Sequence, residues 1–183
     1  MTAEREHNKI IFTGPVGSGK TTAITNLSDA PTVKTEANAS DMTTARKRET
    51  TVALDFGVME LGGNSFVHLY GTPGQERFNF MWDILTQGGI GLVLLLDNTR
   101  ADPFQDLRFF TQAFADFISE TGLVVGVTRM DINPLPDIEQ YRTQFHSTGL
   151  KPPIFEVDAR QRRDVTVLVE ALLYCLDPGL SGG

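Results

Sequence analysis

The stretch "IIFTGPVGSGKTTAI", residues 10–24, decides the fold class. An apolar run typical of a buried strand stops at Gly14, and the pattern G-x-x-x-x-G-K-T follows before a helical pattern begins. Glycine destabilises the interior of regular structure, but it lets a chain curl tightly enough to point several backbone N–H groups at one phosphate. The stretch therefore predicts a strand, a phosphate-binding loop and a helix, in that order.

The chemistry expected of this loop comes from its backbone and from two side chains. The start of the following helix adds unpaired N–H groups and the positive end of the helix dipole. Lys20 is expected to reach the β- and γ-phosphates of a nucleotide, and the Thr21 hydroxyl is expected to ligate Mg²⁺. The residues predicted to form the phosphate site are Gly14, Pro15, Val16, Gly17, Ser18, Gly19, Lys20, Thr21 and Thr22.

Short apolar runs alternate with helical patterns along the rest of the chain, and this alternation predicts an α/β fold of the P-loop NTPase type. We expect a mostly parallel sheet of six strands with one antiparallel strand, about five helices, and a single domain over residues 1–183. Residues 30–50 show no clear period and predict a long loop. The expected strands are 9–13, 51–61, 65–71, 92–97, 123–128 and 153–158, with a hairpin at "GGN", and helical patterns cover 20–29, 103–119, 137–147 and 164–176.

Composition narrows the possible partners and the compartment. The net charge of −7 argues against sequence-independent nucleic-acid binding, which needs Lys and Arg to neutralise phosphates. The longest apolar run is too short to span a membrane, and neither a secretory signal nor a lipidation motif is present. The single cysteine, Cys175, excludes an internal disulfide and is expected to be a buried apolar residue. These features favour a cytoplasmic protein with no direct lipid anchor.

Two positions far from the phosphate loop indicate which base is bound. Asp131 follows the apolar run 123–128, and a carboxylate accepts hydrogen bonds from both N1–H and the 2-amino group of guanine. Adenine offers no such pair of donors. After the next expected strand, the backbone N–H of Ala159 is a candidate donor to guanine O6. The sequence therefore predicts GTP and GDP as ligands, together with Mg²⁺.

Five motifs, in this order and at these spacings, resemble those of the Ras-like small GTPases. They are "GPVGSGKT" (14–21) for the phosphate loop, "TTVALDFG" (50–57) and "YGTPGQERF" (70–78) for the two switches, and "TRMD" (128–131) and "DAR" (158–160) for the base. The resemblance covers nearly the whole chain and implies the small G-protein version of the fold.

The resemblance also implies roles for single residues. Thr51 would sense the γ-phosphate through Mg²⁺, Gly74 would donate its backbone N–H to that phosphate, and Gln75 would orient the attacking water. Hydrolysis would then release residues of about 32 to 52 and 71 to 88, so the protein would act as a switch. The matching positions in the base motifs are Thr128, Arg129, Asp131, Ala159 and Arg160.

The chain departs from the family at several of these positions. Gly71 stands where most members have an aspartate associated with Mg²⁺, Thr128 and Arg129 replace asparagine and lysine, and Val16 occupies a loop position where a side chain can hinder hydrolysis. The runs "LDF" and "HLYGTPGQ" are closer to the bacterial branch that includes the MglA-type GTPases. That branch lacks the same aspartate and carries one that matches Asp55.

Asp55 is therefore a candidate to restore the missing negative charge near Mg²⁺. Side chains alternate along a strand, so Thr51 and Asp55 are expected to point to the same side of the sheet. The alternative is an ordinary strand aspartate. The predicted metal site consists of Thr21, Thr51 and Asp55.

Partners are implied by the resemblance alone. We expect an effector and a GTPase-activating protein, which in the bacterial branch is often a roadblock-type dimer. An arginine often completes the charge of the transition state, and Arg48 is the nearest candidate before the switch threonine, with solvent or partner contact as the simpler interpretation.

Two other functions stay open at this point. A nucleotide-locked scaffold with negligible hydrolysis is favoured by Val16 and Gly71 and opposed by Gln75. A small ATP-dependent kinase would need an arginine-rich lid and a substrate site, and the sequence shows neither.

Overall fold

The computed structural model describes residues 8–39 and 50–177, with the backbone alone at 33–39, 50–53 and 78. The strands are β1 (Asn8–Thr13), β2 (Val33–Ala39), β3 (Thr50–Gly62), β4 (Ser65–Gly71), β5 (Gly89–Asp97), β6 (Leu123–Thr128) and β7 (Ile154–Glu156). The helices are α1 (Lys20–Leu27), α2 (Phe80–Thr86), α3 (Pro103–Ala113), α4 (Ala115–Glu120), α5 (Ile138–Ser147) and α6 (Arg162–Leu176), and a short 3₁₀ helix covers Glu76–Phe78.

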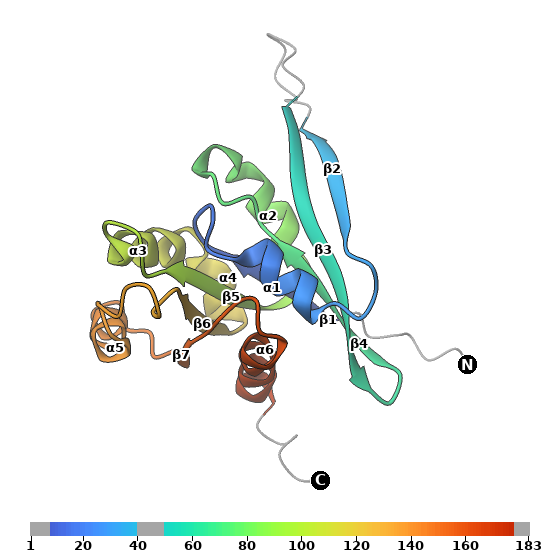
Figure 1. Ribbon diagram of the computed structural model, residues 1–183. Helices are drawn as coiled ribbons and strands as arrows, with labels where there is room; N and C mark the ends of the chain where they lie inside the picture. The colour runs from blue at the N-terminus through green and yellow to red at the C-terminus, as the bar shows by residue number, and fades with distance from the viewer. Residues whose placement is uncertain (1–7, 40–49, 178–183) are drawn as a thin grey trace.

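The strands form one sheet of seven, in the order β2-β3-β4-β1-β5-β6-β7. β3 is antiparallel to both β2 and β4, and the pairs from β4 to β7 are parallel. This arrangement confirms the predicted α/β class with a mostly parallel sheet and one antiparallel strand. β2 and β3 lie at one edge and extend beyond the rest of the sheet (Figure 1).

Four details differ from the sequence-based expectation. The seventh strand is β2, which lies inside the expected loop 30–50 and pairs along its length with β3. The helix expected at 103–119 is two helices, because Phe114, with φ −105°, interrupts it. β7 ends at Glu156, since the next residues turn toward the start of α6. Cys175 is exposed, because the buried face of α6 carries Val165, Leu168, Val169 and Leu172 instead.

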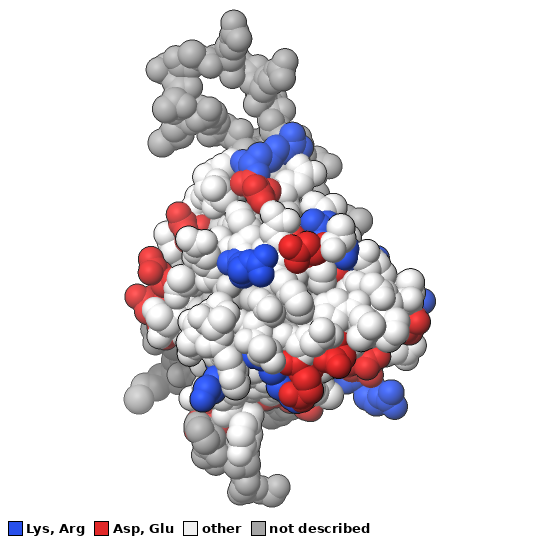
Figure 2. Space-filling model, turned by 90° about the vertical axis from the view of Figure 1, so that its left-hand side faces the viewer, with Lys and Arg blue, Asp and Glu red and all other residues white. Residues whose placement is uncertain are grey.

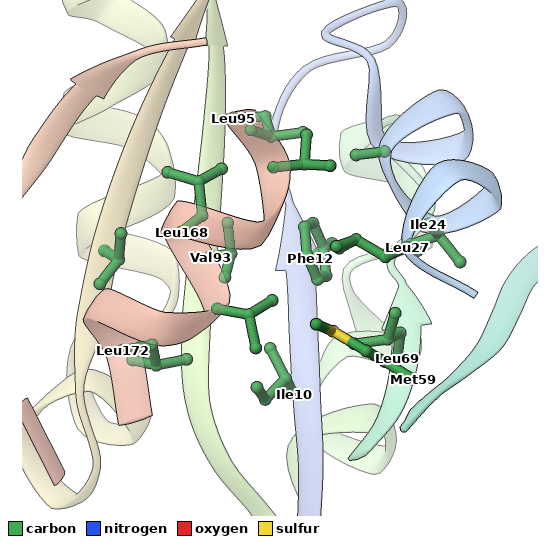
Figure 3. Close-up of a cluster of buried hydrophobic side chains, with 14 of the residues drawn as sticks. Ile10, Phe12, Ile24, Leu27, Met59, Leu69, Val93, Leu95, Leu168 and Leu172 are labelled. Carbon is green, nitrogen blue, oxygen red and sulfur yellow. The ribbon is translucent and has the colours of Figure 1, made fainter. Parts of the chain in front are cut away.

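Helices cover both faces of the sheet, and each face has its own apolar cluster. One cluster packs α1 and α6 against β1, β4 and β5, with Ile10, Phe12, Ile24 and Leu168 among its fully buried residues (Figure 3). The other packs α3, α4 and α5 against β1, β5 and β6 and includes Trp82 of α2. Strands covered on both faces need apolar residues at consecutive positions, and β5 and β6 have this pattern.

The carboxyl ends of the parallel strands lie along one edge of the sheet. Gly14 follows β1, Gly71 ends β4, Asp97 ends β5 and Thr128 ends β6. Ligands of open parallel sheets bind at the carboxyl ends of the strands, so a binding site is expected at this edge.

The face that carries α3 and α5 is mainly uncharged (Figure 2). Two arginines at α3 are paired locally: Arg100 contacts Asp106 of α3, and Arg108 lies 3.7 Å from Asp102, which caps the same helix. Within the described residues, no helix is both long and apolar enough to cross a membrane.

The packing of α6 on β5 generates a test of this core. Leu172 is fully buried, and its side chain lies within 3.0 Å of where a Cβ on Gly91 would be. We expect Leu172→Ala to lower the free energy of unfolding by about 3 kcal/mol in urea denaturation, through lost burial and a residual cavity. Leu176→Ala, at a residue that is 37% exposed, is the matched control and should cost less than about 1 kcal/mol. Equal losses for the two variants would contradict this packing.

Candidate nucleotide-binding site

The loop between β1 and α1 has the backbone that its glycines predict. Gly14, Gly17 and Gly19 have φ values of 143°, 80° and 105°, which side chains of other residues rarely allow. Space is also limited at two of them. A Cβ on Gly14 would lie 2.1 Å from the Leu95 carbonyl oxygen, and one on Gly19 would lie 2.9 Å from the Cβ of Ala159. The loop is therefore packed against β5 and against the segment after β7.

Lys20 opens α1 and folds back over the loop. Its Nζ donates hydrogen bonds to the carbonyl oxygens of Gly14 at 2.7 Å and Pro15 at 2.8 Å, and it lies 3.4 Å from Ser18 Oγ. Burial lowers the pKa of Lys20 to about 8, although the negative charge of Asp55 partly offsets this effect. A cation is thus held inside the loop, next to the N-terminal end of α1, where a phosphate would be attracted.

Thr21 and Asp55 meet directly beside Lys20. The Thr21 hydroxyl donates to Asp55 Oδ2 at 2.5 Å. Asp55 of β3 stands opposite Gly71 of β4 in the sheet, and a Cβ on Gly71 would lie 3.1 Å from the Cβ of Asp55 and 3.2 Å from its Oδ2. A side chain at position 71 would therefore crowd Asp55, and the carboxylate at this site is supplied by β3.

The segment after β4 rests on the phosphate loop. A Cβ on Gly74 would lie 2.6 Å from the backbone nitrogen of Val16, so this contact requires glycine. Gln75 follows with an exposed side chain. The Trp82 indole donates to the Pro73 carbonyl oxygen at 3.1 Å and stacks on Phe114 at 5.0 Å, which fastens the segment to the junction between α3 and α4. Trp82 is thus a buried residue of the apolar core.

A cavity of about 260 Å³ extends from the end of the phosphate loop. Its walls come from the loop and α1, from the end of β6 and from the segment after β7; they include Ser18, Gly19, Thr22, Thr128, Arg129, Asp131, Ile132, Ala159 and Arg160. The Thr128 hydroxyl donates to the carbonyl oxygens of Ser18 at 3.1 Å and Leu96 at 3.2 Å, which ties the β6 end to the loop. The structure thus brings the three predicted base and phosphate motifs together.

Two ion pairs at this cavity were not anticipated from the sequence. Arg129 contacts Asp97, whose side chain is 6% exposed, and Arg160 forms two hydrogen bonds to Asp158, at 2.8 and 2.9 Å. Hydrogen bonds from the side chain of Arg160, and then from its backbone N–H, lower the pKa of Asp158 to about 2, because they favour the carboxylate. The only signal for Asp97 was its place at the end of a buried strand.

The side chains of two predicted residues lie outside the described part of the structure. Thr51 lies within β3, where its backbone pairs with Asn38, but its side chain is not among those described. Arg48 lies outside the described residues. The predicted metal ligands that the structure brings into contact are Thr21 and Asp55.

The fold and this site define a phosphate-loop nucleotide-binding protein. A family model described as "Conserved hypothetical ATP binding protein" matches residues 12–172, and the chain belongs to that family.

Sequence relatives point to a wider group. Ras-related protein RabC of Dictyostelium discoideum is 23% identical over 177 residues, covering 92% of this chain and 83% of RabC. Ras-related protein Rab-10 of Diplobatis ommata is 26% identical over 144 residues, covering 77% of this chain and 64% of Rab-10. An uncharacterized protein of Methanocaldococcus jannaschii is 26% identical over 103 residues, 56% of this chain and 59% of that protein. These distant similarities support a place in the Ras-like small GTPase superfamily.

The buried lysine gives the nucleotide-free protein a characteristic pH dependence. The pKa of Lys20 is about 8 in the folded protein and 10.5 when unperturbed, so the unfolded chain binds more protons between these values. Stability should therefore rise as the pH increases from 8 to 9.5, by on the order of 1 kcal/mol per pH unit. The measurement is urea unfolding in excess chelator, compared with Lys20→Met, which should lack the rise. An equal rise in both proteins would refute the assignment to Lys20.

Proposed function

We propose that this protein is a guanine-nucleotide-binding molecular switch that hydrolyses GTP to GDP with Mg²⁺ and so controls a partner. One observation carries the proposal: a single cavity runs from Gly19 and Thr22, at the end of the phosphate loop, to Asp131 and Ala159. A nucleotide laid along it would have its phosphates on the loop and its base beside the carboxylate. The distant Rab relatives support the same conclusion.

Asp131 favours guanine over the adenine that the family description names. Its carboxylate makes no hydrogen bond to a described residue, and it attracts the positive charge of Arg160. Such an acceptor suits the N1–H and 2-amino donors of guanine, whereas the corresponding edge of adenine presents a lone pair at N1. The backbone N–H of Ala159, at the same cavity, would complete recognition at O6.

The residues beside Lys20 fit a bound Mg²⁺. Mg²⁺ prefers oxygen ligands and is usually held by one or two carboxylates or hydroxyls together with substrate phosphates. Thr21 and Asp55 supply such a hydroxyl and carboxylate in direct contact, and Thr51 is the third proposed ligand. When bound, Mg²⁺ would neutralise charge on the β- and γ-phosphates.

The protein residues would bind and orient the substrate. Lys20 would exchange the carbonyl oxygens of Gly14 and Pro15 for phosphate oxygens. The Gly74 backbone, already against the loop, would donate to the γ-phosphate, and the exposed Gln75 would orient water for in-line attack. Loss of the γ-phosphate would release the segments around 32–52 and 71–88.

The partners are proposed from the family pattern. An aspartate at position 55, opposite a glycine at position 71, is the arrangement that we expect of the bacterial branch that includes the MglA-type GTPases. An effector and a GTPase-activating protein, such as a roadblock-type dimer, would then bind the switch segments. Arg48 is the proposed source of a stimulating arginine within the chain.

A nucleotide-locked scaffold is the second candidate. Its support is Val16, whose side chain is 57% exposed on the loop and whose backbone lies against Gly74. The branched side chain of Val16 would obstruct a water molecule or an arginine side chain that approaches the γ-phosphate. In that case GTP would bind and persist.

Nucleotide binding and single-turnover phosphate release test the proposed function. The purified protein should bind GTP at least tenfold more tightly than ATP, because Asp131 rejects adenine. It should release γ-phosphate slowly, and Gln75→Ala should reduce that rate by about tenfold or more with little change in GTP affinity. Asp131→Asn should shift preference toward xanthosine triphosphate. Binding without release would support the scaffold, and preference for ATP would reject the guanine assignment.

The role of Asp55 has a separate test. Asp55→Ala should weaken GDP affinity by about tenfold or more in millimolar Mg²⁺ and have little effect in excess chelator, because the carboxylate acts through the metal. Asp29→Ala, at an exposed carboxylate beside β3 that binds Glu60 and Arg162, is the matched control and should leave the Mg²⁺ dependence unchanged. An Asp55→Ala protein with the wild-type response to Mg²⁺ would identify Asp55 as an ordinary strand aspartate.

A further inference from the structure

Two arginines and two aspartates line the base end of the cavity. Arg129 and Arg160 both line it, and Asp131 is the carboxylate that the proposed function assigns to guanine. An arginine free to move would compete with the base, since a guanidinium is itself a bidentate donor to a carboxylate. A guanine site with this composition therefore needs its arginines held away from Asp131.

Asp97 holds the first arginine. Its carboxylate is almost fully buried at the end of β5, accepts from Thr99 N at 2.9 Å and Thr99 Oγ1 at 2.6 Å, and contacts Arg129 Nη1. Arg129 is a non-glycine residue with φ 60°, a conformation that costs energy and persists only when its surroundings impose it. Its carbonyl accepts from the N–H groups of Ile132 and Asn133, so the turn that carries Asp131 is built on this residue.

Asp158 holds the second arginine. Arg160 donates from Nε and Nη2 to the two carboxylate oxygens, and its backbone N–H donates to Asp158 Oδ1 at 2.9 Å. Asp158 is itself fixed, because its backbone N–H binds Asp164 of α6 at 3.0 Å. Asp131 is close enough to contribute to the raised pKa of Arg160, yet Asp158 is the larger cause.

We infer that Asp97 and Asp158 are specificity-determining positioning residues: each neutralises one arginine of the base pocket, and Asp131 is thereby kept available for guanine. This inference rests on the proposed guanine-nucleotide function. It assigns no contact with the nucleotide to Asp97. Removal of either carboxylate frees an arginine to pair with Asp131, which lowers the preference for guanine without affecting the phosphate loop.

The experiment compares GDP with IDP, whose base lacks the 2-amino group and so forms one fewer hydrogen bond to Asp131. Wild-type protein should prefer GDP by about tenfold or more. Asp97→Asn keeps an oxygen acceptor for Thr99 but removes the charge, and it should reduce this preference by about threefold to tenfold. Asp158→Asn, at a more exposed carboxylate, should act in the same direction.

A second substitution separates this effect from damage to the fold. Arg129→Met added to Asp97→Asn removes the freed cation and keeps an unbranched stem, so the GDP-over-IDP preference should return. Arg160→Met should likewise rescue Asp158→Asn. Competition by inorganic tripolyphosphate, which probes the phosphate loop alone, should be the same in every variant.

The outcomes are distinct. Loss of preference in the single variants with recovery in the double variants supports the inference. Unchanged preference in the single variants, no recovery in the double variants, or a parallel loss of tripolyphosphate binding overturns it. If the wild-type protein shows no preference for guanine at all, the proposed function fails first, and the inference fails with it.

Discussion

Close backbone approach at the phosphate loop is the constraint on which the rest of the structure depends. Three separate elements reach the loop at positions where no side chain fits: the Leu95 carbonyl at Gly14, Ala159 at Gly19, and Gly74 at the nitrogen of Val16. Each contact requires a glycine, and each brings a different part of the chain to the loop. The end of β5, the segment after β7 and the segment after β4 converge for this reason, and the cavity exists where they meet.

A buried cation and a carboxylate lie close to each other at the same loop. Lys20 is buried with carbonyl partners and a nearby Asp55, so its cation is kept where phosphate would neutralise it. Gly71 leaves the room that Asp55 needs on the adjacent strand. The carboxylate beside Lys20 thus stands on β3, and the residue that faces it on β4 has no side chain.

Much of this could be predicted from the sequence, because the decisive signals are local. The glycine spacing, the helical start at Lys20 and the alternation of apolar runs identified the loop and the α/β class. β2 was missed because an edge strand pairs through its backbone and needs no apolar period. The pairing of Arg129 with Asp97 was missed because these residues lie 32 positions apart and meet only when β5 and β6 are neighbours. Cys175 was assigned to the wrong face of α6 because a mostly apolar helix leaves its buried side ambiguous.

The indole of Trp82 has a consequence of a different kind. It is the single tryptophan of the chain, and its ring nitrogen binds Pro73, which directly precedes the glycine that rests on the phosphate loop. Its ring packs on Phe110 of α3 and stacks on Phe114, and both Trp82 and its hydrogen-bond acceptor lie in the segment 71–88 that is proposed to move. Movement of that segment would therefore change the surroundings of the chain's own fluorophore, and its ultraviolet emission would distinguish the two proposed states.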